Sequence, residues 1–126
     1  MNKQGQLGVL GVFIKPDHSG HGDNAALATI LHDAEATVSK NPVSTPINID
    51  LMLPDDEIED FWHYDGSLTT PPCSEGVKWY VAKKHIHASA HQIEEMAELL
   101  HHHNYRLTQP LNGRVVKSAT ERRSRR

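Results

Sequence analysis

Two segments with a strand pattern flank a short loop that contains two consecutive prolines, and this arrangement constrains the fold more than any other feature. Residues 61–64 begin the first segment. Residues 77–81 alternate hydrophobic residues with Lys78 and Tyr80, which predicts a β-strand with two distinct faces. Between the two segments, residues 67–72 have the composition of a turn. The chain is therefore expected to contain a β-sheet with a tight connection at this point.

Three further segments have strand patterns. Residues 7–14 are hydrophobic at nearly every position, which predicts a strand buried on both faces. Residues 47–51 alternate hydrophobic and polar residues, which predicts a short strand. Another short strand is expected around Val115.

Two segments have helical patterns. Leu27, Ile30, Leu31 and Ala34 follow the spacing of a helix with one hydrophobic face, and Asp23 or Asn24 is suited to cap it. Residues 89–92 form a capping box that begins a second helix. Its expected buried stripe consists of Ile93, Met96, Ala97 and Leu100. Helices and strands together predict a mixed α/β (α+β) fold.

Length and composition narrow the class of protein. The chain has 126 residues, a net charge of −3 and a mean hydropathy of −0.56. These values predict one domain or part of one, and they argue against nucleic acid as the main partner. No hydrophobic stretch approaches the roughly 20 residues that span a bilayer, so no membrane partner is expected. Residues 1–6 do not begin a signal peptide, so the chain as written is expected in the cytoplasm, and a longer precursor in the periplasm or outside the cell. The basic residues in 119–126 are expected to form a frayed, solvated tail.

Specific motifs resemble a known family. The run from Tyr64 to Trp79, YDGSLTTPPCSEGVKW, is similar to the substrate-binding loop and following strand of α-class carbonic anhydrases. Residues 7–15, 45–54 and 104–114 resemble other landmarks of that family in the same order, and Cys73 gives the loop a bacterial character. The resemblance implies part of a large, mostly antiparallel β-sheet fold with peripheral helices. It also implies a cis peptide bond between Pro71 and Pro72.

The resemblance assigns roles to individual residues. The family hydrates carbon dioxide to bicarbonate with a zinc-bound hydroxide, because zinc lowers the pKa of its bound water to about 7. Thr69 matches the catalytic threonine that orients this hydroxide through a hydrogen bond. Its backbone amide matches the position where anions and sulfonamide inhibitors bind. The other expected substrate-binding residues are Leu68, Thr70, Val77, Trp79, Leu7 and Val9, most of which form a hydrophobic wall suited to carbon dioxide.

The same resemblance predicts that the zinc ligands are missing. In the family, three histidines bind zinc, and they lie upstream of the segment that Leu7 begins. The ten histidines here include His85 and His87, whose spacing on a strand suits a metal, but this pair follows the substrate loop. Exposed histidines are the expected outcome for this pair, for His91 and for 101–103. No metal ligands and no complete zinc site are expected in this chain. The single cysteine, Cys73, cannot form an intramolecular disulfide.

Residues 1–126 are therefore expected to form a single partial domain, the C-terminal half of an α-carbonic anhydrase. Three hypotheses follow for its function. The chain is a truncated family member that is inactive alone, or one half of a split enzyme that an N-terminal fragment completes, or a non-enzymatic interaction protein that uses the same scaffold.

Overall fold

The computed structural model describes residues 5–19, 22–36, 45–54, 60–100 and 103–120, and the chain divides into two compact units. The first unit comprises residues 1–13, 55–84 and 105–126, and the second comprises residues 14–54 and 85–104. Each unit contains its own sheet. The expectation of a single partial domain over residues 1–126 stays a prediction.

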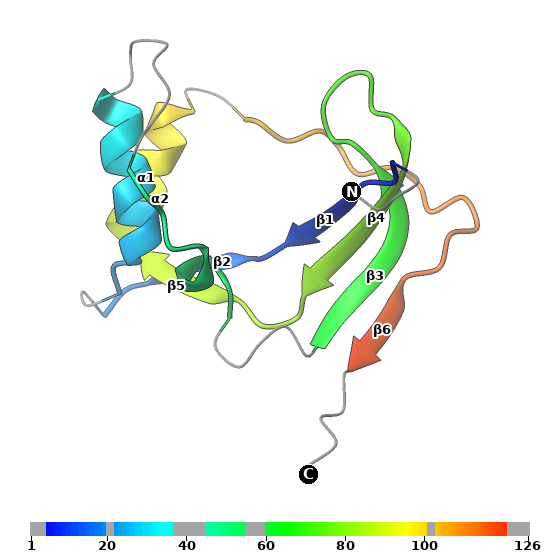
Figure 1. Ribbon diagram of the computed structural model, residues 1–126, viewed down its shortest axis with the longest axis horizontal. Coiled ribbons are helices and arrows are strands. Elements are labelled where there is room, and N and C mark those ends of the chain that lie inside the picture. Colours follow the sequence, from blue (N-terminus) through cyan, green and yellow to red (C-terminus); the bar gives the residue numbers. More distant parts are fainter. Residues whose placement is uncertain (1–4, 20–21, 37–44, 55–59, 101–102, 121–126) are drawn as a thin grey trace. The chain divides into compact units, whose positions relative to one another are not determined.

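The first unit is built on a four-stranded sheet in the order β1-β4-β3-β6 (Figure 1). Strands β3 (Asp60–Ser67) and β4 (Glu75–Ala82) pair antiparallel, which confirms the two strands predicted on either side of the proline loop. Strand β1 (Gly8–Gly11) pairs parallel to β4, and β6 (Lys117–Thr120) pairs antiparallel to β3. The last strand thus begins two residues beyond the position expected around Val115.

The strand register brings four hydrophobic or aromatic residues to one face of this sheet. Trp79 in the middle of β4 pairs with Tyr64 of β3 on one side and with Val9 of β1 on the other. Side chains of directly paired residues lie on the same face. Val77 lies two residues before Trp79, hence on this face, and only 1% of it is exposed. We refer to this surface as the Trp79 face.

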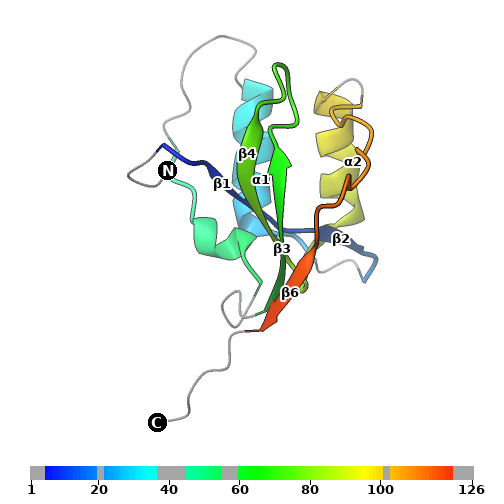
Figure 2. The same ribbon diagram turned by 90° about the vertical axis from the view of Figure 1, so that its right-hand side faces the viewer.

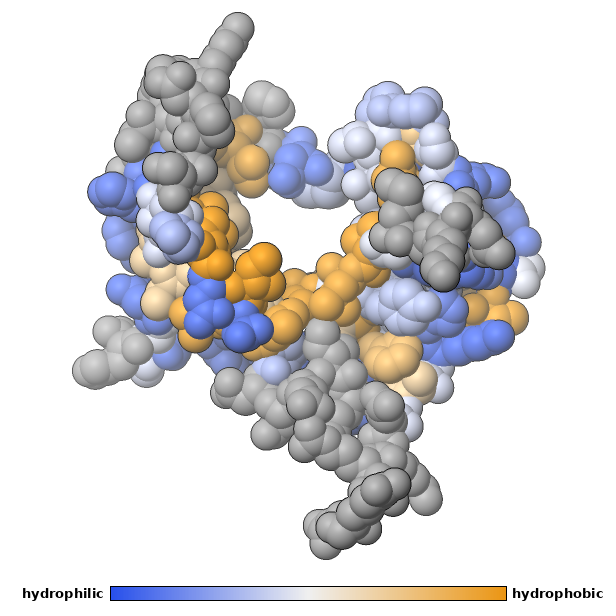
Figure 3. All heavy atoms as spheres, in the orientation of Figure 1, coloured by the Kyte–Doolittle hydropathy of each residue, from blue (hydrophilic) through white to orange (hydrophobic). Residues whose placement is uncertain are grey.

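The prediction of one strand over residues 7–14, buried on both faces, was wrong. Strand β1 ends at Gly11, and Ile14 begins β2 in a different sheet. Leu7 and Leu10 are 37% and 46% exposed, and Figure 3 shows hydrophobic residues at the surface over β1. A run of hydrophobic residues suits a strand covered on both sides, and β1 is an edge strand within the described part of the chain.

The second unit contains two helices and a two-stranded sheet. Strands β2 (Ile14–Asp17) and β5 (Ile86–Ser89) pair parallel. Helices α1 (Ala25–Ala36) and α2 (Ala90–Leu99) lie side by side (Figure 2). The centre of its core is formed by Leu27, Leu31 and Ala88, with Ile14, Ile93, Met96 and Leu99 packed around it.

The predicted helix starts are confirmed by hydrogen bonds. The Asn24 side chain accepts a bond from the Leu27 amide at 3.0 Å, so Asn24 rather than Asp23 caps α1. Ser89 and Gln92 form the predicted capping box of α2. The predicted buried stripe was right for Ile93 and Met96 only: Leu99 replaces Leu100, which is 42% exposed, and Ala97 is exposed as well. Leu100 ends the helix as its C-cap and no longer follows the helical face.

The strand predicted over residues 47–51 was also wrong, because residues Ile49–Met52 form a short 3₁₀ helix, η1. The side chain of Asn48 accepts a hydrogen bond from the Asp50 amide at 3.1 Å. Such a local bond offers the backbone an alternative to strand pairing.

The basic tail was expected over residues 119–126. Ala119 and Thr120 belong to β6, and residues 121–126 lie outside the described part.

Within the described residues, none of the helices has the length and hydrophobicity that crossing a bilayer requires.

Candidate functional site

The loop that joins β3 to β4 carries the motif from which the resemblance was drawn. The amide of Leu68 donates to the Ser74 carbonyl at 2.9 Å and closes the loop at its base. Within it, the Cys73 amide donates to the Thr70 carbonyl at 2.8 Å, which makes a tight turn. The peptide bond between Pro71 and Pro72 is cis, as predicted. The loop is therefore an ordered element with its own hydrogen bonds.

Trp79 connects the sheet to this loop. Its indole nitrogen donates to the Ser67 carbonyl at 3.0 Å, directly before the loop begins. Its ring lies parallel to that of Tyr64, with 6.2 Å between the centroids and 6° between the planes. The sequence assigned Trp79 only to a hydrophobic wall, so its bond to the loop is a finding of the structure.

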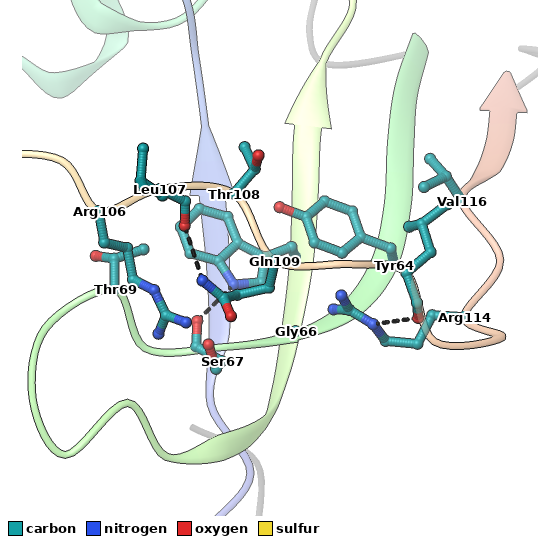
Figure 4. A pocket seen from close by; sticks show the side chains of 12 residues that line it. Tyr64, Gly66, Ser67, Thr69, Arg106, Leu107, Thr108, Gln109, Arg114 and Val116 are labelled. Atoms are coloured by element: carbon teal, nitrogen blue, oxygen red, sulfur yellow. Dashed lines mark hydrogen bonds between the residues drawn. The ribbon is translucent and has the colours of Figure 1, made fainter.

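A cleft of about 380 Å³ lies beside the loop, on the Trp79 face (Figure 4). Thr69, Trp79 and Tyr64 line one side of it, and the segment of residues 106–116 lines the other. Thr69 and Arg106 both line the cleft, as Figure 4 shows. The cleft thus combines an aromatic floor with several hydroxyl-bearing residues and two arginines, which come from separate parts of the chain.

Arg114 connects the segment of residues 106–116 to the sheet through hydrogen bonds. Its guanidinium donates from Nε to the Leu111 carbonyl at 2.9 Å, from Nη1 to the Asp65 carbonyl at 2.9 Å and from Nη2 to the Pro110 carbonyl at 2.8 Å. The planar group with several fixed donors suits this task, which a lysine could not fulfil in the same way. No sequence pattern marks Arg106 or Arg114, although both lie in residues 104–114, which resemble the family.

Lys78 and Asp65 form an ion pair on the face of the sheet opposite the cleft, because they alternate with Trp79 and Tyr64 along β4 and β3. Lys78 donates a hydrogen bond to the Asp65 carboxylate, and this bond lowers the pKa of Asp65 below its usual value. The carboxylate is largely exposed, so the pair is expected to contribute little to stability.

The structure brings part of the predicted substrate-binding set together. Thr69 and Trp79 line the cleft. Val9 and Val77 lie on the Trp79 face, and Leu7, whose carbonyl accepts a bond from the Lys78 amide at 2.9 Å, extends the β1–β4 pairing. Leu68 is half-buried and Thr70 is exposed, and both belong to the loop itself. The role of all seven residues in binding a substrate stays a prediction.

The histidines do not make a metal site with their neighbours in the described residues. His85 and His87 lie near each other, with ring centroids 5.3 Å apart, and both are exposed, as is His91. Within residues 5–19, 22–36, 45–54, 60–100 and 103–120, no group of three or more His, Cys, Asp or Glu residues is placed to hold a metal ion. The described residues therefore do not fit the zinc that the resemblance implies.

Comparisons with known proteins agree on one family. A sequence profile described as eukaryotic-type carbonic anhydrase matches residues 1–120. A carbonic anhydrase of Pectobacterium carotovorum is 38% identical over 116 residues, which are 91% of this chain and 45% of the relative. The human protein named carbonic anhydrase-related protein is 37% identical over 109 residues, covering 75% of this chain and 37% of that protein.

Solved structures give the same result. The α-carbonic anhydrase of Thermovibrio ammonificans, in complex with the inhibitor sulfanilamide, superposes with a TM-score of 0.77 at 37% identity, over 90% of this chain and 48% of that chain. A carbonic anhydrase of Chlamydomonas reinhardtii in complex with acetazolamide gives 0.74 at 39% identity, over 90% and 51% of the two chains. The chain spans about half the length of the relatives that it matches. This chain belongs to the α-class, eukaryotic-type carbonic anhydrase family.

Proposed function

We propose that this chain supplies the substrate-binding part of a carbonic anhydrase site and that it needs a further polypeptide segment to hydrate carbon dioxide. The observation that carries the proposal is the cleft on the Trp79 face, which Thr69 and Trp79 line together. The family membership of the chain supports the choice of reaction.

The residues of this chain would bind and orient. A hydrophobic surface suits carbon dioxide, which has no net dipole, and the Trp79 face offers the indole ring with Val9 paired beside it. Val77 lies on the same face, but it is only 1% exposed and so contributes packing rather than accessible surface. The Thr69 hydroxyl can donate one hydrogen bond and accept others, so it could orient an attacking oxygen. The zinc of the family does not fit the described residues, so no step that depends on it is assigned to this chain.

We expect the purified chain alone to hold no stoichiometric zinc and to show no carbon dioxide hydration above the buffer rate. A hydroxyl and a hydrophobic wall do not by themselves lower the pKa of a water molecule, whereas a catalytic zinc held by three protein ligands does. Metal analysis by mass spectrometry and stopped-flow hydration would check this.

One tightly held zinc per chain, with hydration that sulfanilamide inhibits, would contradict the expectation. The competing function is a non-enzymatic interaction protein on the same scaffold. It would be favoured if the chain also stayed inactive in a stable complex with the unmatched part of the Pectobacterium carotovorum relative.

A further inference from the structure

We infer that the indole of Trp79 holds the loop that carries Thr69 in a single conformation, and that glycine at position 66 makes this possible. The inference rests on the proposed function only in assigning Thr69 to a functional site. Trp79 acts here as a positioning residue, in addition to forming part of the Trp79 face.

The indole provides a hydrogen bond where the pairing of the two strands is interrupted. Gly66 pairs with Val77, but Ser67 pairs with Glu75, so the register shifts between Gly66 and Ser67. The residue passed over, Gly76, has a φ of +85°, a backbone conformation typical of a bulge. A carbonyl at such a place needs a donor, and the Trp79 Nε1 supplies it to Ser67 at 3.0 Å.

Gly66 leaves the space that the indole occupies. A Cβ atom at position 66 would lie 2.8 Å from Cδ1 and 3.2 Å from Nε1 of Trp79, and 3.2 Å from Cε2 of Tyr64. The first distance is shorter than packed side chains allow, so a methyl group there would force the ring to move. The ring also stacks parallel to Tyr64. We expect the shift that relieves this contact to weaken the hydrogen bond from Nε1 to the Ser67 carbonyl.

The hydrogen bond at Ser67 affects the whole loop, because Ser67 lies directly at the point where the loop is closed. Ser67 directly precedes Leu68, whose amide closes the loop on Ser74 at 2.9 Å. Thr69 and Cys73 both lie inside this closed segment. Loss of the hydrogen bond from the Trp79 indole to the Ser67 carbonyl should thus let the loop open locally, while the paired strands beyond it persist.

Cys73 is a suitable reporter, because it is the only cysteine in the chain and is half-buried within the loop. The experiment measures the rate at which Ellman's reagent labels Cys73 in the native 126-residue chain. Trp79→Phe removes the donor and keeps an aromatic ring, and Gly66→Ala displaces the ring. Both variants should be labelled about fivefold faster than the wild type, the effect of losing one hydrogen bond.

Two control variants distinguish the loss of the Trp79–Ser67 hydrogen bond from a general loss of stability. Gly8→Ala places a methyl group in the same sheet, where the nearest atom, the Lys78 carbonyl oxygen, is 3.9 Å away, and its rate should equal that of the wild type. Val81→Ala removes packing from the Trp79 face two residues beyond Trp79, without contact to Ser67. It should lower the unfolding midpoint without a matching increase in the labelling rate.

The inference is overturned if Trp79→Phe and Gly66→Ala are labelled at the wild-type rate. It is equally overturned if Val81→Ala raises the rate as much as they do, or if the wild-type rate equals that of the urea-unfolded chain. None of these measurements depends on catalysis. A failure to hydrate carbon dioxide would contradict the proposed function and leave this result intact.

Discussion

Thr69→Ala is expected to reduce carbon dioxide hydration about 10²-fold once this chain has been combined with a segment that completes the enzyme. Removing one positioned hydrogen-bonding group from an active site has an effect of this order. Thr69 lines the cleft beside Trp79 and is held in a loop with its own backbone hydrogen bonds, so its hydroxyl is well placed to be such a group. Stopped-flow measurement of kcat/KM would give the effect directly.

Thr69→Ser is the matched control, because serine keeps the hydroxyl and loses only a methyl group. Its rate should remain close to that of the wild type. Equal rates for the alanine and serine variants would show that the hydroxyl has no part in the reaction. Labelling of Cys73 in both variants would show whether the loop has kept its conformation.

Gln92→Ala is expected to lower the free energy of unfolding by about 2–3 kcal/mol, because its side chain joins two helix starts inside the second unit. Only 4% of Gln92 is exposed. Its carbonyl oxygen accepts from the Asn24 amide at 2.9 Å, and its amide group donates to the Asn24 carbonyl at 2.9 Å. It also completes the capping box with Ser89. Truncation leaves partly buried backbone groups of α1 and α2 without these partners.

Urea unfolding followed by circular dichroism would measure this change. Gln109→Ala is the control, since Gln109 is exposed and makes one hydrogen bond, to the Leu107 carbonyl. That variant should stay within about 0.5 kcal/mol of the wild type. Equal decreases in the free energy of unfolding for the two variants would show that the buried hydrogen bonds of Gln92 do not stabilise the chain as proposed.

Local patterns predicted the elements whose sequence signal is complete within a few residues. The alternation in residues 77–81 and the capping box at Ser89 each depend on neighbours within a few positions, and both were confirmed. The prediction of one buried strand over residues 7–14 was wrong, because burial on both faces requires covering layers. The hydrophobic run itself carries no information about such layers. The strand predicted over residues 47–51 was wrong, because the Asn48 side chain accepts a local hydrogen bond from the backbone instead.

The cleft could be predicted only in part. The motif around Thr69 was found from a resemblance, but the opposite wall comes from residues 106–116, which are distant in sequence. The three bonds of Arg114 go to backbone carbonyls, which every residue has, so no side-chain pattern marks its partners. The bond from Trp79 to Ser67 depends in the same way on a register shift that the sequence does not reveal.

The most direct test of the central proposal is a complementation experiment. The unmatched part of the Pectobacterium carotovorum relative, loaded with zinc, would be assayed for carbon dioxide hydration by stopped flow, alone and with increasing amounts of this chain. We expect hydration that appears with the chain, saturates at one chain per segment and is inhibited by sulfanilamide. A stable complex of the two polypeptides that hydrates carbon dioxide no faster than the zinc-loaded segment alone would contradict the proposal.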